Sequence, residues 1–177
     1  MEPVTLEDKR IIAAQLGRAA RGLLRVERRC PYGYPQVILV YPLIEGKPFP
    51  TTFWLTCPFL AEEIDRLEEE GWIKRMETLL REDTRLNARL QRAHRAYIEE
   101  RMNLLSVEDR RFLDDSGMSA SLLDKGIGGI GDFNRIKCLH LHVAHALARE
   151  NPIGKIVLKA LPNRACSQNK MICSALV

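Results

Sequence analysis

Five prolines within residues 31–50 limit what the N-terminal third of this chain can form. Proline lacks the backbone N–H donor and clashes with the preceding turn, so no helix can run through the segment. Two runs of β-branched and aromatic residues, 37–41 (VILVY) and 51–55 (TTFWL), stand among these prolines. Such residues favour strands. We therefore expect a small antiparallel sheet of two or three strands over residues 23–56.

Helical patterns surround this segment. Thr5 and Asp8 have the spacing of a capping box and predict a first helix over residues 6–21, ending at Gly22. After Pro58, apolar residues three and four apart predict a short helix that stops at Gly71.

The helical pattern continues towards the C-terminus. Apolar positions from Trp72 to Tyr97 predict one long helix, or two helices that meet near Asp83. Ser106 predicts the start of another short helix, and a last helix is expected near 134–149.

Together these segments predict one α+β domain, mostly helical, with a small Pro-rich antiparallel sheet near the N-terminal third. Residues 1–160 are expected to form a single globular domain, and 161–177 a loose C-terminal tail with few periodic apolar positions. No run approaches the roughly 18 apolar residues of a membrane span, and the N-terminus does not resemble a signal peptide. We expect a cytoplasmic protein.

The five cysteines include no CxxC pair. In a protein without an export signal, cysteines are expected to be free thiols, metal ligands or catalytic groups rather than disulfides. A standard zinc ribbon is excluded, whereas a site that gathers ligands from distant segments is not.

The densest chemical pattern is residues 137–145 (KCLHLHVAH). On a helix, Cys138, His142 and His145 would share one face, and His140 would point nearly opposite. Apolar neighbours indicate a buried helix, in which the imidazoles need partners. The pattern is consistent with a metal site or thiol–imidazole chemistry, and also with core histidines bonded to protein groups.

Two Cys-Pro turns add further thiols. Cys57 precedes Pro58 at a predicted helix start, where the helix dipole favours a thiolate, so Cys57 is either a reactive or ligating thiol or a small buried residue. Cys30 precedes Pro31 in a turn between strands, which suits a metal ligand. Cys166 and Cys173 lie in the expected tail and are not assigned a role.

Other polar groups are weaker candidates for a functional site. His94, Tyr97 and Arg101 share a helical face, and His94 could shuttle a proton or bind an anion with Arg101; a polar helix edge is the simpler interpretation. The glycine-rich stretch 126–131 satisfies G-x-G-x-x-G outside any βαβ pattern, so dinucleotide binding is not expected.

The formal net charge is +4, and basic residues gather near both ends. An anionic ligand could therefore bind, but no stripe of basic residues interleaved with aromatics is present, and nucleic acid is not expected as a partner. The basic clusters are Arg18, Arg21, Arg25, Arg28 and Arg29, and Lys125, Arg135 and Lys137.

Several blocks in order resemble a bacterial family known as domain of unknown function 501. These blocks are residues 29–35 (RCPYGYP), 48–58 (PFPTTFWLTCP), 93–94 (AH) with Tyr97 and Arg101, 126–129 (GIGG), 137–140 (KCLH) through His145, and 151–154 (NPIG). The resemblance covers roughly residues 10–158. It implies roles for Cys30, Cys57, Cys138, His140 and His145, but it implies no particular reaction.

The leading hypothesis is that Cys30, Cys57 and Cys138 converge with one histidine around a metal ion, most simply zinc. His145 is the preferred histidine, and His140 and His142 are the alternates. Soft thiolates would also suit an iron–sulfur cluster, though zinc is the simpler choice.

Two alternatives use no metal. One is a cysteine-dependent enzyme with Cys57 as nucleophile and a histidine of the last helix as base; its candidate catalytic residues are Cys57, His94 and His140. The other is a non-enzymatic module that binds an anionic partner through its basic ends.

Overall fold

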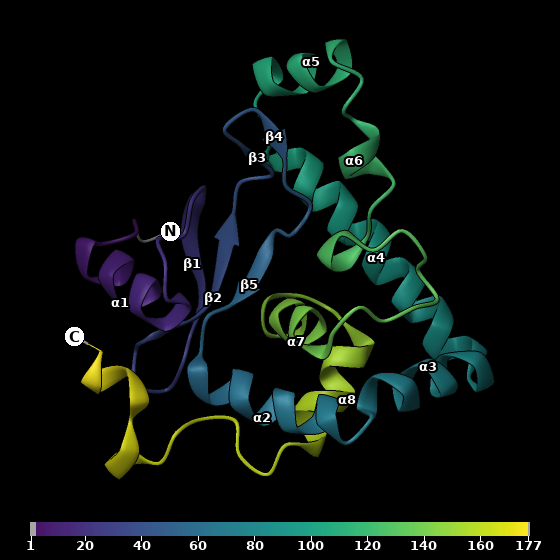
Figure 1. Ribbon diagram of the computed structural model, residues 1–177. Helices are drawn as coiled ribbons and strands as arrows, with labels where there is room; N and C mark the ends of the chain where they lie inside the picture. The colour runs from purple at the N-terminus through teal and green to yellow at the C-terminus, as the bar shows by residue number, and fades with distance from the viewer. Residues whose placement is uncertain (1–2, 177) are drawn as a thin grey trace.

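A three-stranded antiparallel sheet lies at the centre of the computed structural model, which describes residues 3–176, and helices pack on both of its sides (Figure 1). The sheet order is β1-β2-β5, with β1 (Leu23–Arg29), β2 (Pro35–Val40) and β5 (Phe53–Leu55). A separate hairpin is formed by β3 (Leu43–Ile44) and β4 (Lys47–Pro48). The expected α+β class with a small N-terminal sheet is confirmed.

The central strand β2 is buried along its whole length. Val37 and Leu39 belong to the larger core beneath the helices of the C-terminal half. Ile38 and Val40 face the opposite way and pack with Ile12 of the first helix. Because alternate side chains of a strand point to opposite faces, the sheet separates a large core from a small one.

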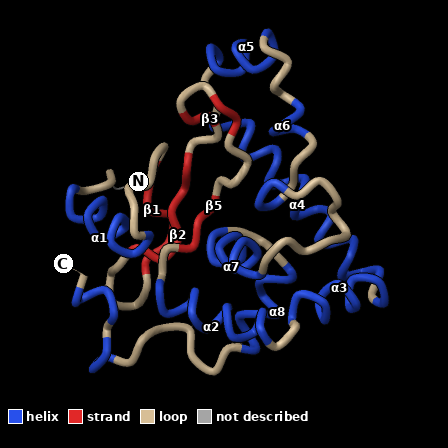
Figure 2. Tube along the Cα trace, in the orientation of Figure 1, coloured by secondary structure: helices blue, strands red, loops and turns tan. Residues whose placement is uncertain are grey.

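Most of the chain outside the sheet is helical (Figure 2). The α-helices are α1 (Leu6–Leu16), α2 (Pro58–Glu69), α3 (Trp72–Glu82), α4 (Thr84–Leu104), α5 (Val107–Asp115), α6 (Ala120–Leu123), α7 (Leu139–Ala148) and α8 (Pro152–Ala160). Three short 3-10 helices are η1 (Ile127–Gly129), η2 (Gln168–Lys170) and η3 (Ile172–Ala175). Among the described residues, no helix combines the length and apolarity that crossing a membrane requires.

The first helix is shorter than expected. The capping box is present, since the Thr5 hydroxyl accepts from the Asp8 N–H and the Asp8 carboxylate accepts from the Thr5 N–H. The helix ends at Gly17, whose φ of 67° is left-handed, and not at Gly22. Glycine adopts this conformation without steric cost, which makes Gly17 an effective stop signal.

Asp83 separates two helices, α3 and α4. Its carboxylate accepts hydrogen bonds from the N–H groups of Arg85 and Leu86, so it caps the start of α4. The polar residue that interrupts the apolar pattern is therefore a helix N-cap. Of the two arrangements that the sequence allowed, the pair of helices is the observed one.

The expected last helix near 134–149 is corrected in two ways. It begins only at Leu139, with Cys138 as its extended N-cap residue. It is also followed by α8: the backbone becomes extended at Arg149, and Asn151 caps the next helix by accepting from the Gly154 N–H. Pro152 suits the first turn of α8, where its missing N–H donor is not needed.

The C-terminal tail carries more structure than its composition suggests. It includes η2 and η3, and Cys173 is buried. The hydroxyl of Tyr32 donates to the carbonyl of Cys166 at 2.7 Å, which holds the tail against the turn between β1 and β2.

Candidate metal centre

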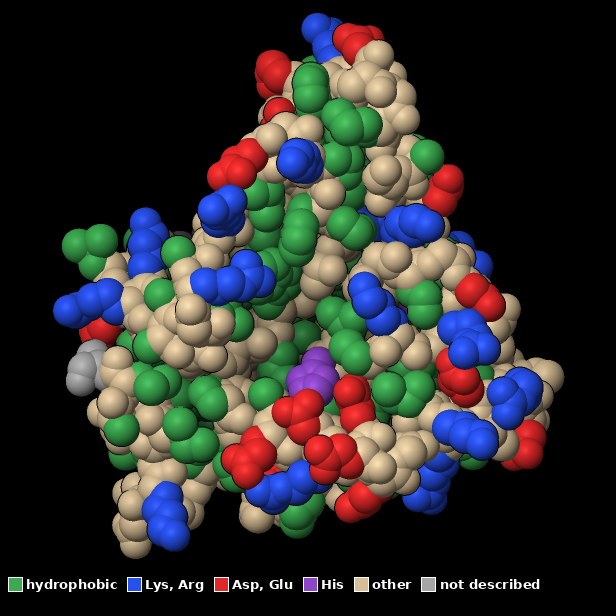
Figure 3. All heavy atoms as spheres, viewed as in Figure 1, with side chains coloured by type: hydrophobic (Ala, Val, Ile, Leu, Met, Phe, Trp, Pro, Cys, Tyr) green, Lys and Arg blue, Asp and Glu red, His purple; other side chains and the backbone are tan. Residues whose placement is uncertain are grey.

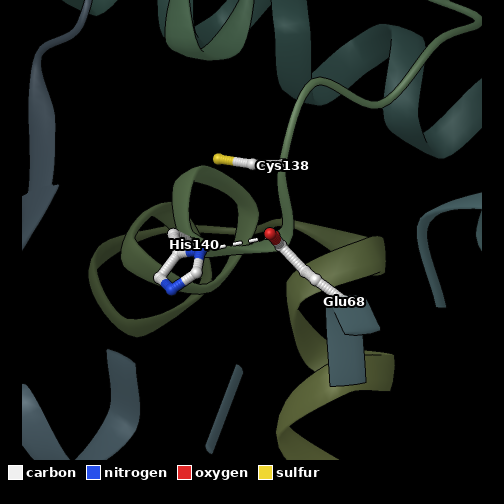
Figure 4. Close-up of side chains that lie close together, drawn as sticks. All are labelled: Glu68, Cys138 and His140. Atoms are coloured by element: carbon white, nitrogen blue, oxygen red, sulfur yellow. Dashed lines mark hydrogen bonds and ion pairs between the residues drawn. The ribbon is translucent and has the colours of Figure 1, made fainter. Parts of the chain in front are cut away.

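Glu68, Cys138 and His140 bring three potential metal ligands to one place (Figure 4). A carboxylate oxygen, the cysteine sulfur and an imidazole nitrogen all lie within 4.8 Å of one another. Glu68 stands in the last turn of α2, Cys138 caps α7, and His140 stands in the first turn of α7. Within residues 3–176, no other group of three such side chains is this close.

The start of α7 determines this arrangement. Cys138 is extended, with φ of −160° and ψ of 157°, so its side chain leaves the backbone just before the helix begins. The N–H of Leu139 donates to the Glu68 carboxylate, as expected at a helix N-terminus with unpaired N–H groups. The same carboxylate lies 3.3 Å from Nδ1 of His140.

The second ring nitrogen of His140 is also held. Nε2 lies 3.2 Å from the carbonyl oxygen of Ala61 and 3.4 Å from a carboxylate oxygen of Asp65. In Figure 4 the Nδ1 edge of the ring faces Glu68, the Cys138 sulfur lies on that side, and Nε2 points away. A single nitrogen therefore faces the other two ligand atoms.

The charge of this cluster is unusual for a histidine site. Burial alone would lower the pKa of His140, but the hydrogen bond to Cys138 and the negative charges of Glu68 and Cys138 raise the pKa to about 9. Without a metal ion, His140 is thus a cation beside acidic groups at neutral pH.

The cluster is accessible from outside. The side chains of His140 and Glu68 are 25% and 22% exposed, and Cys138 is half-buried. The other three histidines are buried. Figure 3 shows a histidine at the surface beside a group of acidic side chains.

The model of a family described as "Protein of unknown function (DUF501)" matches residues 26–159. The chain belongs to this family. No curated protein and no solved structure matches the chain. All three residues of the cluster lie in the DUF501 region, as do Cys30 and Cys57, whereas Cys166 and Cys173 lie beyond it.

The structure does not gather Cys30, Cys57, Cys138 and His145 into one set. Cys57 caps the start of α2, eleven residues from Glu68 and thus about 16 Å away along the helix axis. Cys30 and Cys57 instead line a small pocket together with Cys166 and Cys173. The two Cys-Pro turns meet as expected, but they meet away from Cys138.

The shared helical face of Cys138, His142 and His145 is also corrected. Cys138 precedes the helix, so the helical spacing does not apply to it. His140, which was expected to point away from Cys138, is instead its neighbour in the cluster.

Cys57 has the expected place at a helix N-terminus but not the expected acidity. Its thiol is buried, with 6% of the residue exposed. Burial raises the pKa of Cys57, and the nearby backbone N–H of Leu60 only partly offsets this. The cost of burying a charge therefore outweighs the helix dipole.

His142 and His145 form a buried network with Asn151. The Asn151 amide nitrogen lies 3.2 Å from Nδ1 of each histidine. Burial lowers the pKa of His142 to about 4 and that of His145 to about 3, so both are neutral. The expectation that they are buried is confirmed, and hydrogen bonds within the protein satisfy their Nδ1 atoms.

His94 is buried beside the glycine-rich loop. Its Nδ1 accepts from the Ile127 N–H at 3.0 Å, and its ring stacks on Phe133. A Cβ on Gly126 would lie 2.2 Å from this Nδ1, so glycine is needed for the close approach. Burial lowers the pKa of His94 to about 3, which does not suit a proton shuttle near neutral pH.

Arg101 also has a packing role. Its guanidinium donates to the carbonyls of Pro50 and Gly126, to that of Leu122 in α6 and to that of Lys125 in the loop after α6. The expected contact with Tyr97 is present, since the guanidinium carbon lies 5.6 Å from the ring centroid. The face shared by His94, Tyr97 and Arg101 is thus buried rather than a polar edge.

Many of the basic residues near the N-terminus are paired with acids. Arg21 contacts Glu45, Arg25 contacts Glu27, and Arg29 contacts Asp8. These pairs offset much of the charge that an anionic partner would recognise.

No sequence pattern indicated Glu68 as a candidate ligand. It lies in the acidic run 68–70 at the end of a helix, where acids normally face solvent. Only the fold brings this helix end to the start of α7, seventy residues later.

Proposed function

We propose that this protein binds a divalent metal ion, most simply zinc, through Glu68, Cys138 and His140. The observation that carries the proposal is the convergence of three different ligand atoms within 4.8 Å at an accessible place. Zinc binds thiolate, imidazole and carboxylate, and sites with three protein ligands leave a fourth position open.

The donor set fits such an ion. With Cys138 and Glu68 ionised and His140 neutral, the cluster carries two negative charges, which a divalent cation balances.

The surroundings of His140 support the same assignment. Metal-binding histidines usually donate their second ring N–H to a carbonyl or carboxylate. Here Nε2 faces the Ala61 carbonyl and the Asp65 carboxylate, which leaves Nδ1 for the metal. The N–H of Leu139 fixes the Glu68 carboxylate in a similar way.

An open fourth position would suit hydrolysis, because a metal ion with three protein ligands can activate a bound water molecule. Glu68, Cys138 and His140 would hold the ion, and the Ala61 carbonyl and the Asp65 carboxylate would orient the His140 ring at Nε2.

The test is metal binding by matched variants. Chelator-treated wild-type protein should bind zinc at this site. The variants Glu68→Gln, Cys138→Ser and His140→Gln should each weaken zinc binding by more than about 100-fold, because loss of an outer-sphere partner alone lowers metal affinity 10–100-fold. The control is Glu69→Gln, which removes the adjacent, exposed carboxylate of α2 and should bind as wild type does. Equal zinc binding by the wild type and all three variants would refute the proposal.

A second candidate is a metal-free thiol enzyme with Cys138 as nucleophile. The proximity of the Cys138 sulfur and the His140 imidazole favours this candidate. Cys138 replaces Cys57 as the candidate nucleophile because Cys57 is buried. However, in such enzymes the imidazole links nucleophile and carboxylate through its two different nitrogens. In this protein Nδ1 faces both Cys138 and Glu68 (Figure 4), and the carboxylate at Nε2 is that of Asp65, which is 64% exposed, lies 3.4 Å away and shares this nitrogen with the Ala61 carbonyl. Rapid alkylation of Cys138 in wild type, slowed in His140→Gln and unaffected by zinc, would support the thiol enzyme instead.

A further inference from the structure

Four cysteines from three parts of the chain line one enclosed pocket. Cys30 comes from the turn after β1, Cys57 caps α2, and Cys166 and Cys173 come from the C-terminal tail. Figure 1 shows the yellow tail passing close to the start of α2. A fifth cysteine, Cys138, belongs to the cluster at the other end of α2.

The size of this pocket limits its occupant. Its free volume is about 10 Å³. That is about the space of one water-sized sphere and far less than an organic ligand requires. Apart from the sulfurs, its lining is largely aromatic and aliphatic, with Tyr34, Pro35 and Ile172 among the neighbours. A space of atomic size among four thiols suits a single metal ion.

A hydrogen-bond donor is already directed at one of the sulfurs. The Gln15 side-chain amide donates to the sulfur of Cys173 at 3.2 Å and to the carbonyl of Pro35 at 2.8 Å. Hydrogen bonds to sulfur stabilise thiolates and tune metal–thiolate centres.

We propose that Cys30, Cys57, Cys166 and Cys173 form a second metal site, which binds a soft metal through four thiolates. Binding of a divalent ion to the four thiols releases four protons and leaves a complex with two negative charges. The site is independent of the centre at Cys138 and ties the C-terminal tail to the family domain.

Burial raises the pKa of both Cys57 and Cys173, and the negative charges of neighbouring ionised cysteines raise it further. Without metal, these two thiols should remain protonated.

Metal binding requires the sulfurs to move closer together. In a zinc–thiolate tetrahedron, neighbouring sulfurs are about 3.8 Å apart. In the described part of the chain, no three of these four sulfurs lie within 4.8 Å of one another. Two of the four belong to the tail, whose shift would close the set around one ion. An iron–sulfur cluster is larger than a single ion and also uses four thiolates.

The experiment compares the full-length wild type with Cys166→Ala/Cys173→Ala and, as the matched control, Cys138→Ser. Each protein is purified without oxygen, stripped with chelator and titrated with cobalt, whose absorption in the near ultraviolet grows with the number of bound thiolates. Wild type and Cys138→Ser should show an intense thiolate band that zinc abolishes. The double alanine variant should lose most of this band. A parallel incubation with iron and sulfide distinguishes a cluster from a single ion, and either result supports a four-thiolate site.

Protein stability without metal separates loss of binding from loss of folding. In chelator, the double alanine variant should melt within a few degrees of the wild type, because alanine is tolerated at a buried apolar position. Zinc should then raise the Tm of the wild type and of Cys138→Ser, but not that of the double variant. A cobalt band of equal strength in wild type and double variant would overturn the proposal. A disulfide between any two of the four cysteines would also overturn the proposal. So would equal rates of alkylation of the four thiols with and without zinc.

Because Cys138→Ser removes only the other centre, the two proposals can fail separately. Loss of the Glu68–Cys138–His140 site would leave the four-thiolate band unchanged.

Discussion

Acid should destabilise this protein through its three buried histidines, His94, His142 and His145. None of them is more than 2% exposed. Burial lowers their pKa values from 6.5 to about 3, 4 and 3. In the unfolded chain these histidines therefore bind protons near pH 6.5, whereas in the folded protein they remain neutral until a much lower pH. The stabilisation is present above pH 6.5 and is lost as the pH falls towards the folded pKa values.

The expected loss is large compared with ordinary protein stability. Each histidine with a folded pKa well below 5 contributes a loss of about 2 kcal/mol between pH 7.5 and pH 5. Three such residues together cost about 6 kcal/mol, whereas domains are typically stable by about 5–15 kcal/mol.

The assay is urea unfolding at pH 7.5 and pH 5 with chelator present. The variant His94→Gln keeps an acceptor for the Ile127 N–H but has no titratable ring. Its free energy of unfolding should fall by about 2 kcal/mol less than that of the wild type over this range. His140→Gln is the contrasting variant: the pKa of His140 is raised to about 9, so its stabilisation increases as the pH falls from 7.5 to 5, and the variant should lose more free energy of unfolding than the wild type. Equal losses in His94→Gln and wild type would refute the reasoning.

Two further variants test the packing around α7. Gly154→Ala would place a Cβ 2.1 Å from the carbonyl oxygen of His142, so we expect its free energy of unfolding in urea to fall by about 3 kcal/mol or more. The control is Gly17→Ala, where a Cβ meets no neighbour and only the left-handed conformation is strained, so we expect a loss of about 1 kcal/mol. Equal costs would contradict the close approach of α7 and α8. Tyr97→Phe removes the hydroxyl that accepts from the N–H groups of Thr52 and Phe53, and should cost about 1–3 kcal/mol; a cost near zero would show that these donors find other partners.

Much of the fold follows from local signals in the sequence. The prolines confine the sheet to the N-terminal third, and the side chains of Thr5, Asp83 and Ser106 mark helix starts where the structure has them. Errors occur where two stop signals compete or where a helix start lacks a cap. Gly17 ends α1 before Gly22, and Cys138 makes no side-chain capping bond that would distinguish it from a residue inside α7.

The candidate site was predictable only in part. Cys138 and His140 were recognisable as potential ligands from their residue types. Glu68 was not, because its role depends on the contact between the end of α2 and the start of α7. Cys166 and Cys173 also have no local pattern, and they become notable only because the tail returns to Cys30 and Cys57. Contacts between distant segments are set by tertiary packing, which residue spacing does not encode.

The most direct test of the proposed centre is zinc X-ray absorption of the Cys166→Ala/Cys173→Ala variant loaded with one equivalent of zinc. The Glu68–Cys138–His140 site predicts one sulfur at about 2.3 Å and nitrogen or oxygen neighbours at about 2.0–2.2 Å in four-fold coordination. Replacement of Cys138 by Ser in the same background should abolish the sulfur contribution. A spectrum with no sulfur neighbour, or one dominated by several sulfurs, would contradict the account.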